Sequence, residues 1–173
     1  MCEKNHKPKI IVFDLDYTLW PFWIDTHVNP PFKNYSIKIS IDLFLKLREG
    51  NDIIDSHGQI IKYYKEVPDV LKYLYEEGYE LGIASRTSEI QGAKQLLNLF
   101  NWDNYFKYKE IYPGNKVTHF SRIQKISETE YKDMIFFDDE YRNIKDIEKL
   151  GVTCIYVKNG INYTLVENSL KSF

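Results

Sequence analysis

Short apolar runs alternate along the chain with longer stretches in which apolar residues recur every three or four positions. Four runs have the form of buried strands, because β-branched and large apolar residues follow one another and each run ends among polar residues. These runs cover residues 10–15, 81–85, 134–138 and 153–157. A fifth run, over residues 105–111, is more polar, and we expect it nearer an edge of the sheet.

Helical spacing fills the chain between these runs. One apolar stripe follows Pro68 and stops at Gly78, another follows Ser88, whose hydroxyl could cap the helix, and the last ends at Gly151. Strands that alternate with such helices predict an α/β fold, with a doubly wound, Rossmann-like parallel sheet and helices on both faces. The four stripes are Val70, Leu71, Leu74 and Tyr75; Ile90, Ala93, Leu96, Leu97 and Phe100; Val117, Phe120, Ile123 and Ile126; and Ile144, Ile147 and Leu150.

Residues 24–66 interrupt this alternation. Positions 37–47 alternate between apolar and mostly polar residues, which favours a strand, although positions 41, 44, 45 and 48 also form a passable helical face. A turn at residues 56–58 between two pairs of isoleucines predicts a hairpin. We therefore expect one domain over residues 1–173, with an insertion or flap at about 33–65 that lies over one end of the sheet.

Composition and charge narrow the class of protein. The 173 residues carry a net charge of −2, which offers no electrostatic basis for binding nucleic acid or an anionic membrane. The two cysteines form neither a disulfide framework nor a metal-ligand spacing, and the apolar runs are too short for a signal peptide or a membrane span. We expect a cytoplasmic protein, with a monomer favoured.

Polar residues that could take part in catalysis or ligand binding lie where the predicted strands end. The run at 10–15 leads into Asp14-Leu15-Asp16, the run at 81–85 into Ser85-Arg86, and the run at 134–138 into Asp138-Asp139, while Lys116 opens a helix. In a doubly wound sheet, ligands bind beyond the carboxyl ends of the strands, so these residues should converge.

The charges of these residues indicate the chemistry. Asp14, Asp16 and Asp138 would repel one another if crowded, so we expect a cation among them, and an all-oxygen ligand set favours Mg²⁺. Mg²⁺ with Lys116 and the Ser85 hydroxyl forms a phosphate site, and the backbone N–H groups of Leu15 and Asp16 can hold further phosphoryl oxygens. We expect Asp14 to act as the nucleophile.

Asp16 can serve as general acid and base, since residues two apart in an extended chain point to the same side. Each motif taken alone has an ordinary structural explanation: Asp-x-Asp is commonly a turn, and Asp138-Asp139 could cap a helix. We assign Asp139 to a cap or to a supporting position behind the ligands, and His119 to a helix surface. Taken together, in this order, the pieces indicate a phosphatase.

At these residues the chain resembles the haloacid dehalogenase superfamily of aspartate-dependent phosphatases, and within it the magnesium-dependent phosphatase family, also described as magnesium-dependent acid phosphatases. The matching strings cover most of the chain. They are FDLDYTLWPFWIDTHVNPPF (13–32), EVPDVL (66–71), ASRTSEIQGA (84–93), EIYPGNKVTHF (110–120), FFDDEYRNI (136–144) and LGVTCI (150–155).

The resemblance implies a role for each matching residue. Asp14 would be the nucleophile and a Mg²⁺ ligand, Asp16 the general acid/base and a ligand through its backbone carbonyl, and Asp138 the third ligand. Ser85 and Lys116 would hold the phosphoryl group, with Arg86 and Trp23 on the substrate. The implied substrates are phosphomonoesters, either phosphotyrosine in a phosphoprotein or a small sugar or fructosamine phosphate, hydrolysed through an aspartyl-phosphate.

Two points of the resemblance bear on substrate access. The chain is similar to the superfamily members that lack a large cap domain, which implies an open site. The insertion at 33–65 looks longer than in the family, and we expect it at the catalytic end of the sheet, where it would select substrates. The main alternative function is a phosphoacceptor signalling domain of the receiver type. That class carries its acidic pair on the first strand and its acceptor aspartate on a later one, whereas Asp14 and Asp16 both follow the first strand here.

Overall fold

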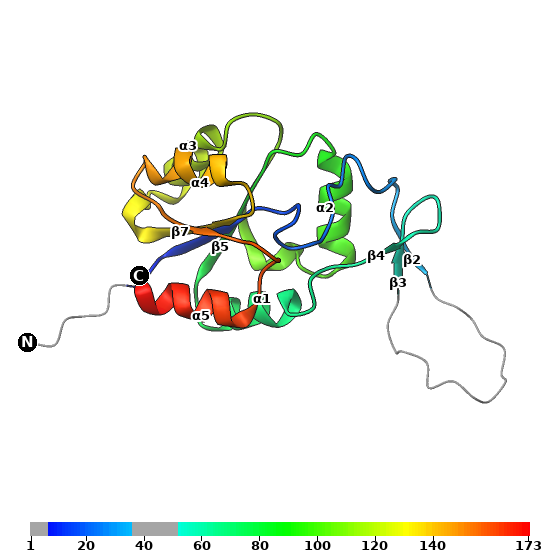
Figure 1. Ribbon diagram of the computed structural model, residues 1–173, viewed down its shortest axis with the longest axis horizontal. Helices are drawn as coiled ribbons and strands as arrows, with labels where there is room; N and C mark the ends of the chain where they lie inside the picture. The colour runs from blue at the N-terminus through cyan, green and yellow to red at the C-terminus, as the bar shows by residue number, and fades with distance from the viewer. Residues whose placement is uncertain (1–6, 36–51) are drawn as a thin grey trace, which may run out of the picture.

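The computed structural model describes residues 7–35 and 52–173, which form a five-stranded parallel sheet between two layers of helices (Figure 1). The strand order is β6-β5-β1-β7-β8, and every neighbouring pair is parallel. The strands are β1 (Ile10–Phe13), β5 (Glu80–Ser85), β6 (Phe106–Ile111), β7 (Met134–Asp138) and β8 (Thr153–Tyr156). The predicted α/β class is confirmed, and the more polar β6 lies at an edge as expected.

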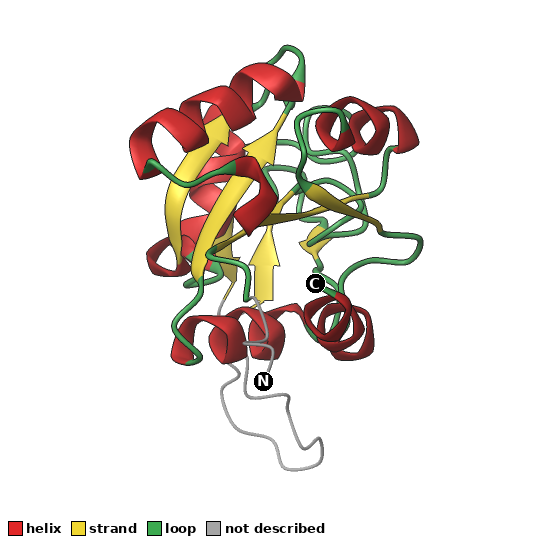
Figure 2. Cartoon of the chain, turned by 90° about the vertical axis from the view of Figure 1, so that its left-hand side faces the viewer, coloured by secondary structure: helices red, strands yellow, loops and turns green. Residues whose placement is uncertain are grey.

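Helices cover both faces of the sheet, as Figure 2 shows. Side chains alternate along β1: Ile11 and Phe13 point into one core cluster, and Ile10 and Val12 into the other. The first cluster packs against α1 (Val67–Glu76), α2 (Ile90–Leu99) and α5 (Tyr163–Ser172), and the second against α3 (Lys116–Ser127) and α4 (Tyr141–Glu148). Short 3-10 turns at Asp103–Tyr105 and Tyr131–Asp133 precede β6 and β7.

Two helix details differ from the sequence prediction. The cap of α2 is Glu89, whose side chain accepts a hydrogen bond from the Gly92 N–H at 3.0 Å, whereas the Ser88 hydroxyl donates to Asp25 Oδ2 at 3.3 Å. The prediction of Ser88 as the cap was therefore wrong by one residue. The C-terminal helix α5 was not predicted; it begins after Asn162, whose side chain accepts from the Leu165 N–H at 2.9 Å.

The described part of the insertion is a small antiparallel sheet of β2 (Lys33–Tyr35), β3 (Asp52–Ile54) and β4 (Ile60–Ile61). The predicted hairpin is confirmed as the β3–β4 pair, while the alternation at 37–47 lies outside the described residues. Gln95 of α2 holds the incoming chain with two hydrogen bonds of 2.8 Å to the backbone of Phe32. The small sheet therefore lies beyond α2 (Figure 1).

Asp55 ties the hairpin turn to the chain that precedes the small sheet. Its Oδ1 accepts hydrogen bonds from the N–H groups of His57 and Gln59 at 2.9 and 2.8 Å, and its Oδ2 from the N–H of Asn29 at 3.0 Å. Burial acts to raise the pKa of Asp55, but the bonds from Gln59, Asn29 and His57 outweigh it, so the pKa is lowered. The ionised carboxylate is thus a structural part of the turn.

None of the helices within residues 7–35 and 52–173 has the length and apolar character needed to cross a bilayer.

Candidate active site

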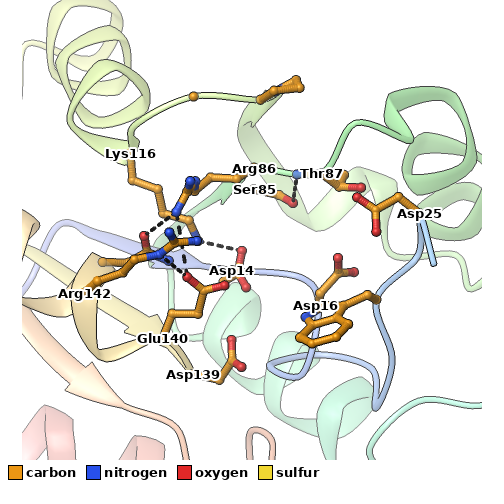
Figure 3. A pocket seen from close by; sticks show the side chains of 14 residues that line it. Asp14, Asp16, Asp25, Ser85, Arg86, Thr87, Lys116, Asp139, Glu140 and Arg142 are labelled. Carbon is orange, nitrogen blue, oxygen red and sulfur yellow. Dashed lines mark hydrogen bonds and ion pairs between the residues drawn. The ribbon is translucent and has the colours of Figure 1, made fainter. Parts of the chain in front are cut away.

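A pocket of about 290 Å³ opens at the carboxyl ends of β1, β5 and β7 (Figure 3). Its walls come from the chain after β1, the Ser85–Thr87 segment after β5, the turn before α3 and the start of α4. Asp14, Asp16, Ser85 and Lys116 all line it. The structure thus brings together polar residues that are far apart in the sequence.

Lys116 stands at the centre of the pocket floor. Its Nζ donates to Asp14 Oδ1 at 2.6 Å and to Asp138 Oδ2 at 2.5 Å. Lys116 is the first residue of α3, whose start is fixed because Asn115 Oδ1 accepts from the Val117 N–H at 2.8 Å. This cap aims the lysine side chain at the ends of β1 and β7.

The three groups of this cluster are almost wholly buried. Burial raises the pKa of Asp14 and the charge of Asp138 adds to the rise, while the nearby Lys116 ammonium acts against it. Burial would lower the pKa of Lys116, but the attraction of Asp14 and Asp138 prevails and raises it. The ammonium is therefore held in its charged form, between carboxylates that would otherwise repel each other.

Asp138 is oriented from its other side by α4. Its Oδ1 accepts from the Glu140 N–H at 2.6 Å, and Asn143 Nδ2 donates to both of its carboxylate oxygens at 3.2 and 3.1 Å. Asn143 in turn accepts from Arg86 Nη1 at 3.3 Å. The sequence analysis missed Asn143, although an asparagine five residues after a strand-end acid, in the first turn of a helix, could have indicated it.

The carboxylates form a candidate metal centre. Single oxygens of Asp14, Asp138 and Asp139 lie within 4.8 Å of one another. The three carboxyl groups offer only oxygen ligands, and Lys116 is the one cation in contact with Asp14 and Asp138 among the hydrogen bonds and ion pairs described above. This donor set fits a hard divalent cation such as Mg²⁺. Asp139 is not the cap of α4, which begins after Glu140. Burial, followed by the charges of Asp138 and Glu140, raises the pKa of Asp139 to about 7.

Asp16 lies beside this candidate metal centre, but its carboxylate is not part of the group formed by Asp14, Asp138 and Asp139. Its Oδ1 accepts from Trp20 Nε1 at 2.7 Å and from the Ile24 N–H at 3.3 Å. Burial raises its pKa to about 6, against the lowering effect of those two hydrogen bonds. A carboxyl group that titrates near neutrality can both give and take a proton.

The remaining candidate residues surround the pocket. The Ser85 side chain is buried and its Oγ accepts from the Thr87 N–H at 3.4 Å. Arg86 lies at the rim, where its Nη1 is 3.7 Å from Glu140 Oε2. Trp23 is 47% exposed and stacks on His27 with ring centres 5.3 Å apart. Leu15 is fully buried in the core, so it can meet a ligand only through its backbone.

Two expectations about the surroundings of the site differ from the structure. His119 was expected on a helix surface, but it is completely buried, because its ring reaches the backbone between β5 and α3. The insertion was expected over the catalytic end of the sheet. Among its described residues, 33–35 and 52–65, none lines the pocket, since the small sheet packs beyond α2.

Comparison with known proteins gives concordant results. A family model described as Acid Phosphatase matches residues 6–173. The chain is 51% identical over 166 residues to magnesium-dependent phosphatase 1 of Homo sapiens, covering 96% of this chain and 87% of that protein. It is 39% identical over 173 residues to a HAD-like hydrolase superfamily protein of Schizosaccharomyces pombe, covering 94% of each.

Solved structures show the same fold at low sequence identity. A HAD-superfamily hydrolase from Ehrlichia chaffeensis has a TM-score of 0.62 at 14% identity, covering 96% of this chain and 97% of that one. CbbY from Rhodobacter sphaeroides, solved in complex with phosphate, has a TM-score of 0.58 at 12% identity, covering 86% and 85%.

Proposed function

The chain belongs to the acid phosphatase family of magnesium-dependent phosphatases, within the HAD-like hydrolases, and from this premise we propose that it hydrolyses phosphomonoesters through an aspartyl-phosphate on Asp14. As a member of this family it is a Mg²⁺-dependent phosphoric monoester hydrolase. We further propose that residues 1–173 act as one catalytic domain. The observation that carries the reaction scheme is the pair of short contacts from Lys116 Nζ to Asp14 and Asp138.

Asp14 is suited to be the nucleophile because one of its oxygens is held by Lys116 and faces the pocket. In the first step an Asp14 oxygen forms a bond to phosphorus while the bond from phosphorus to the leaving oxygen breaks. Asp16 donates its proton to that oxygen. Its pKa of about 6 supports this role, since a fraction of the carboxyl groups is protonated near neutral pH.

The second step returns the enzyme to its starting state. Asp16, now ionised, takes a proton from a water molecule, whose oxygen attacks the phosphorus of the aspartyl-phosphate. The bond from phosphorus to Asp14 breaks, inorganic phosphate leaves, and both carboxyl groups recover their original protonation. Two neighbouring acids thus take different roles, one covalent and one in proton transfer.

The side chains of Asp14 and Asp138 and the backbone carbonyl of Asp16 would hold Mg²⁺, with Asp139 beside them. When bound, the ion supplies positive charge that neutralises the phosphoryl oxygens and lets a carboxylate approach a phosphate dianion. Lys116 contributes a second positive charge from the floor of the pocket, and Asn143 keeps the Asp138 carboxylate in place.

The substrate would be held by its phosphoryl group first. The Ser85 hydroxyl, Lys116 and the backbone N–H groups of Leu15 and Asp16 are proposed to bind the phosphoryl oxygens. Arg86 and Trp23 stand at the rim, where they would contact the leaving group. A pocket of about 290 Å³ suits either a small sugar phosphate, including a fructosamine phosphate, or the phosphotyrosine side chain of a phosphoprotein.

The decisive experiment is to follow phosphate release from para-nitrophenyl phosphate by purified protein, with and without Mg²⁺. We expect turnover that EDTA abolishes and Mg²⁺ restores, and an Asp14→Asn variant that folds but releases no phosphate, because an amide is a poor nucleophile. Turnover by Asp14→Asn at a near wild-type rate would remove the covalent scheme. Phosphorylation of Asp14 without repeated turnover would instead support the receiver-type function. A panel of phosphopeptides, sugar phosphates and fructosamine phosphates would then identify the substrate class.

A further inference from the structure

His119 is a fully buried polar side chain close to the pocket, and the reaction scheme above gives it no role. It lies on α3, three residues after Lys116, and faces the turn between β6 and that helix. Buried polar groups in proteins are normally paired, so the partners of its ring indicate what it does.

The ring nitrogens of His119 meet only backbone carbonyl oxygens. Nε2 lies 2.9 Å from the carbonyl oxygen of Ser85 and 2.9 Å from that of Tyr112. Nδ1 lies 3.1 Å from the carbonyl oxygen of Asn115. A carbonyl oxygen can accept but not donate, so a hydrogen on Nε2 is shared between the Ser85 and Tyr112 carbonyls, and a hydrogen on Nδ1 would be donated to Asn115.

These three carbonyls come from two walls of the pocket, the end of β5 and the turn before α3. Ser85 ends β5 and carries the hydroxyl proposed to bind phosphate, and Tyr112 leads into Pro113 and Gly114, which line the pocket. Asn115 caps the helix that begins with Lys116. One imidazole ring therefore joins the end of β5, the turn after β6 and the first turn of α3.

The ring is also held firmly in place. The aromatic ring of Tyr112 stacks on it with centres 4.1 Å apart and an interplanar angle of 15°. The backbone supports the same junction, because the Tyr112 N–H donates to the Ser85 carbonyl at 3.1 Å. A ring fixed by stacking can transmit the position of one wall to the other.

We propose that His119 is a positioning residue, which sets the distance between the Ser85 hydroxyl and the Lys116 ammonium by donating a shared hydrogen bond to Ser85 and Tyr112. The inference rests on the proposed function, since that function makes Ser85 and Lys116 the phosphoryl-binding pair. A displacement of about 1 Å in such a pair can reduce the rate by roughly 100-fold. His119 touches neither substrate nor metal in this scheme.

Two substitutions that differ by one methylene group test the proposal. In His119→Gln the amide nitrogen is as many bonds from Cβ as Nε2 is, and its two hydrogens can serve both carbonyls. In His119→Asn the amide has the same chemistry but ends one bond short of them. Ile123→Ala is the matched control, because Ile123 is fully buried on the same helix and has no part in the pocket.

The measurements are kcat and KM for para-nitrophenyl phosphate, the dissociation constant of inorganic phosphate in the presence of Mg²⁺, and Tm. All are taken at a temperature where every variant is folded. We expect His119→Asn to lose roughly 100-fold in kcat/KM and to bind phosphate about tenfold more weakly. His119→Gln should stay within about fivefold of wild type, and Ile123→Ala should lower Tm without changing kcat/KM by more than about threefold.

Three outcomes would overturn the proposal. Equal losses in the glutamine and asparagine variants would show that the shared donor is not what matters. Full activity in folded His119→Asn, or an equal loss in Ile123→Ala at a similar Tm, would reduce His119 to ordinary core packing. A wild-type protein without turnover would instead count against the proposed function, and phosphate binding by the same variants would still decide the role of His119.

Discussion

Replacing Lys116 by methionine should destabilise the protein strongly when Mg²⁺ is absent and much less when Mg²⁺ is bound. Methionine keeps most of the length of the side chain but removes the ammonium that lies 2.6 Å from Asp14 Oδ1 and 2.5 Å from Asp138 Oδ2. The lysine side chain is only 2% exposed and that of Asp138 is fully buried, so water cannot replace the lost charge. The substitution leaves two buried carboxylates facing each other.

Breaking a buried ion pair by removing one partner typically costs about 3–5 kcal/mol. Part of this cost is offset because the pKa of Asp14, already raised by burial, rises further without Lys116, and the protonated carboxyl is neutral. We therefore expect a loss of about 3 kcal/mol in the free energy of unfolding at neutral pH without Mg²⁺. Mg²⁺ at a hundredfold excess over its dissociation constant adds about 2.7 kcal/mol to any native state that binds it. Because no ammonium neutralises the two carboxylates in the variant, we expect the variant to bind the ion more tightly than wild type does, so the difference in the free energy of unfolding between the two proteins should narrow.

Urea unfolding followed by tryptophan fluorescence, with EDTA and with saturating Mg²⁺, measures both quantities. Lys149→Met is the control, since Lys149 pairs with Asp146 at 3.0 Å on the surface with a side chain 74% exposed. That change should alter the free energy of unfolding by no more than about 0.5 kcal/mol in either condition. The reasoning fails if Lys116→Met is as stable as wild type without Mg²⁺, or if its loss is the same in both conditions.

Three further predictions concern the surroundings of the site. Asp55→Ala should lower the free energy of unfolding by about 2–4 kcal/mol, because the backbone N–H groups of Asn29, His57 and Gln59 lose their hydrogen-bond acceptor. It should leave kcat unchanged. A variant as stable as wild type in a denaturant titration would contradict this prediction. Since the pKa of Asp55 is lowered, this stabilisation is present at neutral pH and disappears as the pH falls through that pKa. Trp20→Phe removes the hydrogen bond from Trp20 to Asp16, which lowers the pKa of Asp16 below the value that burial alone would set. The pKa should therefore rise, and the fall in kcat/KM with rising pH, expected near pH 6 in wild type, should move to higher pH. A pH profile that does not move would exclude Asp16 as the general acid. A variant in which an Asn-Gly turn replaces residues 36–51 and joins Tyr35 to Asp52 should fold, because these two residues are register partners in an antiparallel pair. It should hydrolyse a small aryl phosphate at a rate within about tenfold of wild type. A folded but inactive variant would place residues 36–51 in the catalytic machinery.

The fold was predictable from the sequence because the central strands are buried on both faces. A strand such as β7, with all five residues buried, appears in the sequence as four consecutive apolar residues that lead into Asp138. The convergence of Asp14, Ser85 and Asp138 followed from topology alone, since parallel strands end at one edge of the sheet. Lys116 could be added because it opens the helix after the next strand.

The features that were missed depend on contacts between distant segments. His119 was placed at the surface because it is polar, although it shares the buried face of α3 with Ile123, four residues further on, and the carbonyls of Ser85 and Tyr112 make its burial favourable. The position of the small sheet is set by Gln95, which holds the backbone of Phe32 against α2. Periodicity within one element carries no information about such partners.

The central place of β1 in the sheet also determines when the site can come into being during synthesis. Ile10 pairs with Glu80 on one side and with Met134 on the other, so β1 is synthesised well before either of its neighbours in the sheet. Until α3 and β7 have emerged, Asp14 has neither its lysine partner nor the second carboxylate beside it. A nascent chain therefore holds an ordinary aspartate at position 14, and the reactive group forms only after the segment that contains Lys116 and β7 has emerged.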